Sequence, residues 1–85
     1  MLNNKALVEI FIPATGSTFD AFIPLESKVG EVLTLLSNAL TDLSTGRFIA
    51  TSSTVLCDAN TGTILDINMT VADLGIKNGS RLMLI

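Results

Sequence analysis

Residues 27–43 carry the clearest helical signal in the chain, and short strand-like runs lie on both sides of it. The apolar residues of this segment recur at steps of three and four: Val29, Val32, Leu33, Leu36, Leu40 and Leu43. That spacing predicts one apolar stripe along a helix of about four turns, with Ser27 as its N-cap and Gly46 available beyond its end. Gly30 lies inside the stripe, where it would let the helix approach the sheet closely.

Two β-rich runs precede this helix, at residues 7–12 and 18–23, with Pro13 to Ser17 between them. Apolar runs that flank a short Pro/Gly turn predict an antiparallel hairpin. Side chains alternate between the faces of a strand, so Glu9 and Asp20 indicate the face that meets water. The inward positions are then Val8, Ile10, Ile12, Phe19, Ala21 and Ile23, and the outward positions are Leu7, Phe11 and Phe22.

Shorter elements are predicted after the helix. Residues 54–57 and 63–65 favour strands joined by a turn at 58–62, whereas residues 47–53 have no clear assignment. Thr70 to Leu74 is typical of a single helical turn, capped by Thr70 and ended by Gly75. Residues 77–80 predict a tight turn into a last strand at 81–85.

Composition indicates one folded domain, residues 1–85, because 48% of the residues are hydrophobic and only 15% are charged. No apolar run approaches the roughly 20 residues of a membrane helix, so direct membrane insertion is not expected. The net charge of −3 and five scattered basic residues argue against nucleic acid as a partner. The absence of a secretory signal at the start and the lone Cys57 favour a cytoplasmic location.

The order of a hairpin, a helix, two strands, a helical turn and a last strand predicts an α+β fold. More specifically, it predicts a β-grasp (ubiquitin-like) domain with a mixed sheet of four to five strands and one main helix across one face. Residues 70–84 resemble the end of ubiquitin, in which a Thr-Leu-Ser-Asp-type turn precedes an Ile, a polar loop and the final strand. The helix and the loop that leads to Thr54 are longer than those of ubiquitin.

Within that superfamily, residues 8–13, 19–24 and 75–82 resemble the small bacterial ubiquitin-like proteins of the YukD/EsaB family. The resemblance implies a cytosolic accessory protein of a type VII (ESX-like) secretion system of Gram-positive bacteria, not conjugated to other proteins. Its partners would be proteins, such as membrane or ATPase components of that system. The last residue of the sequence is Ile85 rather than a Gly-Gly pair, which argues against the alternative of a sulfur carrier or protein modifier. A ubiquitin-like domain excised from a larger protein is a further alternative.

The sequence contains no recognisable set of catalytic residues. The chain contains no histidine, and Cys57 has no base partner at a recognisable spacing. Neither the spacing of the acidic residues nor that of the glycines predicts a metal, cofactor or phosphate site. We therefore expect no enzyme activity and no cofactor. If Asp58 faces water, the alternation of side chains along the strand points Cys57 inward, as an inert buried thiol.

The outward-facing apolar residues provide the one positive indication of a binding site. If Leu82 and Leu84 are buried in a central last strand, Met83 and Ile85 turn outward beside the first strand. Contiguous exposed apolar area often marks a partner site, and the same sheet face is the main recognition surface of ubiquitin, which this arrangement resembles. The predicted partner-binding residues are Leu7, Phe11, Phe22, Leu56, Met83 and Ile85. The alternatives are cover by residues 47–53 or by a second copy in a homodimer.

Overall fold

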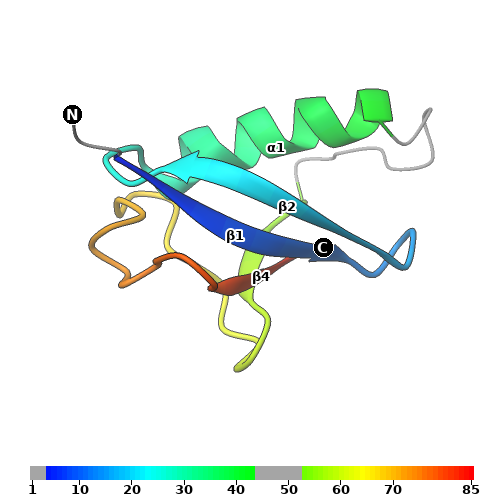
Figure 1. The fold of residues 1–85 in the computed structure, drawn as a ribbon. Helices are drawn as coiled ribbons and strands as arrows, with labels where there is room; N and C mark the ends of the chain where they lie inside the picture. Colours follow the sequence, from blue (N-terminus) through cyan, green and yellow to red (C-terminus); the bar gives the residue numbers. More distant parts are fainter. Residues whose placement is uncertain (1–3, 44–52) are drawn as a thin grey trace.

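The computed structural model describes residues 4–43 and 53–85. Within these ranges, one helix lies across one face of a mixed four-stranded sheet whose strand order is β2-β1-β4-β3 (Figure 1). The elements are β1 (Lys5–Ile12), β2 (Ser17–Pro24), α1 (Val29–Leu43), β3 (Leu56–Asp58) and β4 (Arg81–Leu84). This arrangement confirms the predicted α+β, β-grasp fold.

The hairpin of β1 and β2 has the predicted antiparallel register, from Lys5 opposite Pro24 to Ile12 opposite Ser17. Its turn ends at Gly16, which has a φ of 68° and donates its N–H to the carbonyl of Ile12 at 2.9 Å. The predicted faces are confirmed. The inward residues are buried or partly buried: Val8, Ile10, Ile12, Phe19, Ala21 and Ile23. The outward residues are exposed: Leu7, Phe11 and Phe22.

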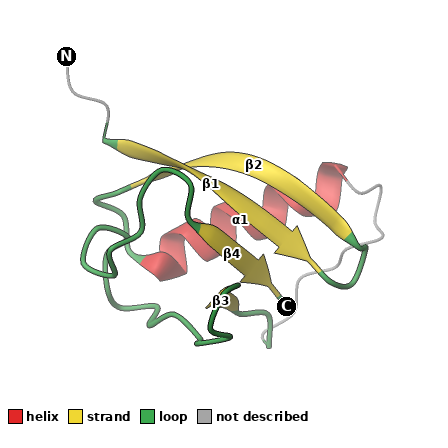
Figure 2. Cartoon of the chain, turned by 60° about the horizontal axis from the view of Figure 1, so that its bottom comes forward, coloured by secondary structure: helices red, strands yellow, loops and turns green. Residues whose placement is uncertain are grey.

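The last strand, β4, lies between β1 and β3 in the sheet (Figure 2). It runs parallel to β1, with Leu82 opposite Ile10, and antiparallel to β3, with Leu84 opposite Leu56. Ile85 extends this pairing, because its N–H and carbonyl bond to Val55 at 3.0 and 2.7 Å. The prediction that residues 81–85 are held within the sheet is therefore confirmed.

The helix buries the predicted stripe against the sheet. Val29, Val32 and Leu40 are buried, and Leu33 and Leu36 pack partly buried against the same core. The side chain of Leu43, and Gly46, lie outside the part of the chain that is described.

The N-cap of α1 is Lys28, so the prediction of Ser27 is wrong. The carbonyl of Lys28 accepts the N–H of Val32 at 3.2 Å, and its N–H donates to the Glu31 carboxylate at 2.9 Å. That reciprocal bond is half of a capping box. Ser27 is engaged elsewhere, because its carbonyl accepts the N–H of Val71 at 3.0 Å.

The first turn of α1 is anchored to the chain before β4. The N–H groups of Val29 and Gly30, which no helix can satisfy internally, donate to the carbonyls of Met69 and Ile67 at 2.9 and 3.0 Å. A Cβ on Gly30 would lie 3.3 Å from the Ile67 oxygen. The close approach that Gly30 permits is thus to residues 66–69, and not to the sheet as predicted.

Two of the predicted short strands differ from those observed. The third strand is Leu56–Asp58 rather than 54–57, and residues 63–65 form only an isolated bridge between Cys57 and Ile64. The later turns are as predicted. Thr70 Oγ1 accepts the N–H of Asp73 at 3.1 Å, and Gly75 and Gly79 have φ values of 74° and 87°.

A matched pair of leucine truncations tests this assignment of the core. Leu84 is 0% exposed and Leu35, on the solvent side of α1, is 60% exposed. Leu84→Ala should lower the free energy of unfolding by about 2–5 kcal/mol, because it leaves a cavity. Leu35→Ala should change it by less than about 0.5 kcal/mol. Urea denaturation followed by circular dichroism measures both, and equal losses would contradict the burial described here.

Candidate protein-binding surface

The sheet face opposite α1 carries an apolar row that crosses three strands. Phe11 of β1 lies opposite Met83 of β4. On its other side, Met83 lies opposite Cys57 of β3, and Cys57 in turn forms an isolated β-bridge with Ile64. We call these four residues the apolar row. Phe11 and Ile64 are 38% and 62% exposed, Met83 is half-buried and Cys57 is buried. Ile85, two positions after Met83 and on the same side, is 49% exposed.

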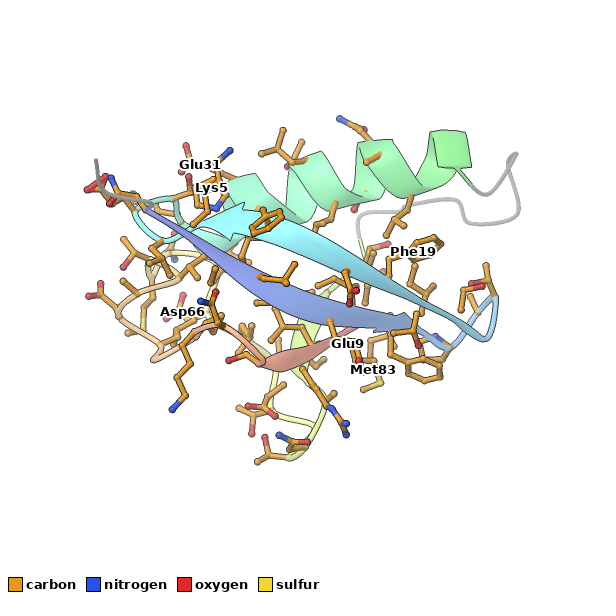
Figure 3. All side chains as sticks on the ribbon, in the orientation of Figure 1. Lys5, Glu9, Phe19, Glu31, Asp66 and Met83 are labelled. Atoms are coloured by element: carbon orange, nitrogen blue, oxygen red, sulfur yellow. The ribbon has the colours of Figure 1, made fainter. Side chains whose placement is uncertain are left out.

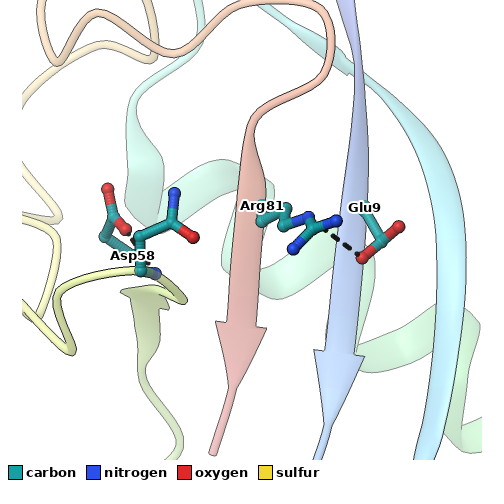
Figure 4. A network of polar contacts seen from close by, with 4 residues as sticks. Glu9, Asp58 and Arg81 are labelled. Carbon is teal, nitrogen blue, oxygen red and sulfur yellow. Dashed lines mark hydrogen bonds and ion pairs between the residues drawn. The ribbon is translucent and has the colours of Figure 1, made fainter.

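A charged row lies next to the apolar row on the same face. Asp20 is opposite Glu9, and Glu9 is opposite Arg81. Arg81 Nε and Glu9 Oε1 are 3.7 Å apart, as Figure 4 shows. Their side chains are 65% and 45% exposed, so this ion pair contributes little to stability. Its importance is positional, because it places charge in the middle of the sheet face.

The six predicted residues therefore do not form one continuous patch. Leu7 and Phe22 are opposite each other on the far side of the charged row from Phe11 and Met83. The register brings Phe11, Met83 and Ile85 together and keeps Leu7 and Phe22 apart from them. Figure 3 shows Glu9 and Met83 on this face.

Leu56 does not belong to this surface. It is 2% exposed and is part of the hydrophobic core, opposite Leu84. The prediction that it faces outward is wrong, because the true register of β3 pairs it with an inward residue of β4.

Cys57 takes the outward position that was predicted for Leu56. It is buried, as expected, but on the face of Phe11 and Met83 rather than toward the helix. Its neighbours across the strands are Met83 on one side and Ile64 on the other. Burial raises the pKa of the Cys57 thiol above its ordinary value of 9.0. The neutral, weakly nucleophilic form therefore dominates near neutral pH.

Asp58 misled the prediction of the β3 faces. Its carboxylate, labelled in Figure 4, accepts the N–H groups of Asn60 and Thr61 at 2.7 and 3.2 Å. These bonds form an Asx turn, which reverses the chain toward Ile64.

Sequence reasoning missed Ile64 as a member of the apolar row. The available signal was the alternation within Thr63-Ile64-Leu65, in which a buried Leu65 requires an outward Ile64. Ile67 and Met69, also exposed and also missed, lie where the chain passes the first turn of α1.

Residues 4–43 and 53–85 contain no cluster of three or more His, Cys, Asp or Glu side chains that could hold a metal ion. Across those ranges, no helix combines the length and apolar character needed to cross a bilayer.

A sequence profile of the WXG100 protein secretion system (Wss) protein YukD matches residues 7–84. The chain belongs to the YukD family. The resemblance seen in the hairpin and the final turn is thereby confirmed. Direct comparison with curated protein sequences gives no match.

Solved structures with the same fold include the ubiquitin-like domain of the Mycobacterium tuberculosis type VII secretion system protein ECCD1. A chain of the "MycP5-free ESX-5 inner membrane complex" is 17% identical with a TM-score of 0.73, covering 98% of this chain and 21% of that one. The ubiquitin-like domain of EccD5 from Mycobacterium xenopi is 18% identical with a TM-score of 0.68, covering 98% and 94%. The ubiquitin of Caldiarchaeum subterraneum is 21% identical with a TM-score of 0.70, covering 95% and 91%. At these identities the likeness establishes a ubiquitin-like fold, and this chain spans only about a fifth of the ESX-5 chain.

The burial of Cys57 predicts a pH dependence. The folded state holds the thiol proton more tightly than the unfolded chain, so stability is undiminished below pH 9.0 and falls as the pH rises above it. The Cys57→Val variant should lack this part of the decrease in the free energy of unfolding at alkaline pH. Urea denaturation of both proteins between pH 7 and 10.5 measures the difference.

The same burial predicts that the native thiol reacts with Ellman's reagent at pH 8 only as fast as the fold opens, and immediately in 6 M guanidinium. Fast native reaction, or an equal alkaline loss in Cys57→Val, would contradict the assigned environment.

Proposed function

We propose that this chain is a non-catalytic protein-interaction module of a type VII (WXG100) secretion system. The observation that carries the proposal is the match of the YukD profile to residues 7–84. The same fold in the ubiquitin-like domain of the Mycobacterium tuberculosis type VII secretion system protein ECCD1, and in a chain of the ESX-5 inner membrane complex, supports the proposal. The expected location is the cytoplasm, where the chain would act as an accessory protein.

The docking site in this proposal consists of Phe11 and Met83 of the apolar row, together with Ile85. Phe11, Met83 and Ile85 offer aromatic and flexible apolar side chains on a rigid sheet, a composition favoured at interface centres. The ion pair of Glu9 and Arg81 gives this patch a polar border on one side. The chemistry that would recognise it is an apolar protein surface with a charged or polar rim.

The partner proposed is a membrane or ATPase component of the same secretion system. A non-enzymatic role accords with the surface, since a buried cysteine of raised pKa is the only thiol and its neighbours across the strands, Met83 and Ile64, supply no base. The chain would therefore act by binding alone, either bringing components of the secretion system together or holding one of them in place.

A charge introduced into the patch tests the docking site. Phe11→Asp and Met83→Asp should each weaken capture of the system's membrane or ATPase component roughly thirtyfold, the effect of losing an interface hot spot. Leu35→Asp is the matched control, because Leu35 is 60% exposed on α1 and lies away from this face. Co-purification of tagged variants from the source organism measures the effect. Unchanged capture by both sheet variants, or loss in Leu35→Asp alone, would contradict the proposed site.

A further inference from the structure

One edge strand of the sheet, β2, has no further strand beside it in the described ranges and presents a regular row of main-chain groups. Leu25 donates its N–H to the carbonyl of Asn4 at 2.6 Å, which makes that pair a hydrogen-bonded one. Bonded pairs alternate in an antiparallel hairpin, so the next are Ile23 with Ala6, Ala21 with Val8 and Phe19 with Ile10. The N–H and carbonyl groups of the residues between them point away from β1: Thr18, Asp20 and Phe22.

The opposite edge of β1 confirms this alternation. Glu9 donates its N–H to the carbonyl of Ser80 at 3.0 Å, and the carbonyl of Leu7 accepts the N–H of Gly79 at 2.9 Å. Glu9 lies opposite Asp20, and Leu7 lies opposite Phe22. Since the main-chain groups of Glu9 and Leu7 point away from β2, those of Asp20 and Phe22 point away from β1. Within residues 4–43 and 53–85, nothing bonds to the outward main-chain groups of Thr18, Asp20 and Phe22.

The side chains along this edge define what could pair with it. Thr18, Asp20 and Phe22 are exposed on the outer face, and Phe22 is 62% exposed. On the helix side, Phe19 and Ala21 are only partly buried. Pro24 has no N–H, so the open run of donors ends at Phe22.

Asp20 carries the decisive charge. Its neighbour Glu9 is compensated by Arg81 at 3.7 Å, but Asp20 has no ion-pair partner in the described ranges. The chain as a whole has a net charge of −3. A strand that brings a cation opposite Asp20 would relieve the repulsion between Asp20 and Glu9.

A second copy of this chain fits the edge poorly. The antiparallel register that uses all three outward residues of both copies is centred on Asp20, and it places the two Asp20 carboxylates directly opposite each other. Like charges in that position destabilise a strand pair. Registers shifted to avoid this contact leave one outward residue of each copy unpaired.

We propose that the free edge of β2 binds an extended segment of a partner protein as an added antiparallel strand, with a basic side chain opposite Asp20. The two residues beside that basic residue are apolar, because they lie opposite Phe19 and Ala21 on the helix side. The residue opposite Phe22 is apolar or aromatic. This is strand addition, in which main-chain bonds give affinity and alternate side chains give specificity. The surface is separate from the apolar row and does not depend on the proposed function.

The probe for this site is the peptide acetyl-Phe-Ile-Lys-Ile-Thr-amide, titrated into the uniformly ¹⁵N-labelled chain and followed by NMR. Binding should shift the amide signals of Thr18, Asp20 and Phe22 and slow their exchange with solvent. Replacing Lys by Glu in the peptide should weaken binding roughly tenfold, and Asp20→Lys should reverse that preference. N-methylation of the central peptide amide should abolish binding, because it removes a main-chain donor while retaining the charge.

Two controls separate this site from the docking site proposed above. Met83→Asp should bind the peptide as the parent chain does, and Phe22→Ser should weaken binding without loss of fold, because Phe22 is exposed. The proposal is overturned if no shift occurs at millimolar peptide, if the shifts centre on Phe11 and Met83, or if Asp20→Lys leaves the preference unchanged. Concentration-dependent shifts at the same amides without peptide would identify a second copy as the occupant instead.

Discussion

The placement of β4 between β1 and β3 is the constraint on which the rest of this structure depends. This strand pairs in parallel with β1 and antiparallel with β3. Its pairing with β1 brings together two segments that are separated by most of the sequence. Loop closure is unfavourable in entropy, and the buried Leu82 and Leu84 supply apolar burial that opposes this cost. The same register fixes the proposed docking face, because it sets Met83 between Phe11 and Cys57.

The helix depends on that closure as well. Its first two N–H groups bond to carbonyls in residues 66–69, and residues 25 and 27 accept from residues 72 and 71 in return. These main-chain bonds join the beginning of α1 to the segment that leads into β4. The helix is thus fixed at its N-terminal end by hydrogen bonds and along its length by the buried stripe. Neither contact alone would set both its position and its direction across the sheet.

Charge divides the open face of this ubiquitin-like domain into two areas of different chemistry. The ion pair of Glu9 and Arg81 lies between the patch at Phe11 and Met83 and the pair of Leu7 and Phe22. The first area is a side-chain surface on the middle of a rigid sheet. The second borders the edge strand β2, where the proposed recognition uses main-chain groups. The two proposed sites are therefore separate on this chain, and each can be tested without the other.

The sequence by itself determined the hairpin, the helical stripe and the final turns, because these depend on local alternation, spacing and glycine conformation. Glu9 and Asp20 gave the faces of β1 and β2 correctly, since both carboxylates meet water. Asp58 gave the wrong faces for β3, because it lies opposite the inward Leu82 and its carboxylate accepts the N–H groups of the following turn. Only the tertiary structure decided three other features. They are the faces on which Leu56 and Cys57 lie, the hydrogen bonds that make Lys28 rather than Ser27 the N-cap, and the division of the predicted patch by the charged row. They depend on strand register between segments far apart in the chain, and side-chain periodicity within one segment carries no information about which residue of another segment lies opposite.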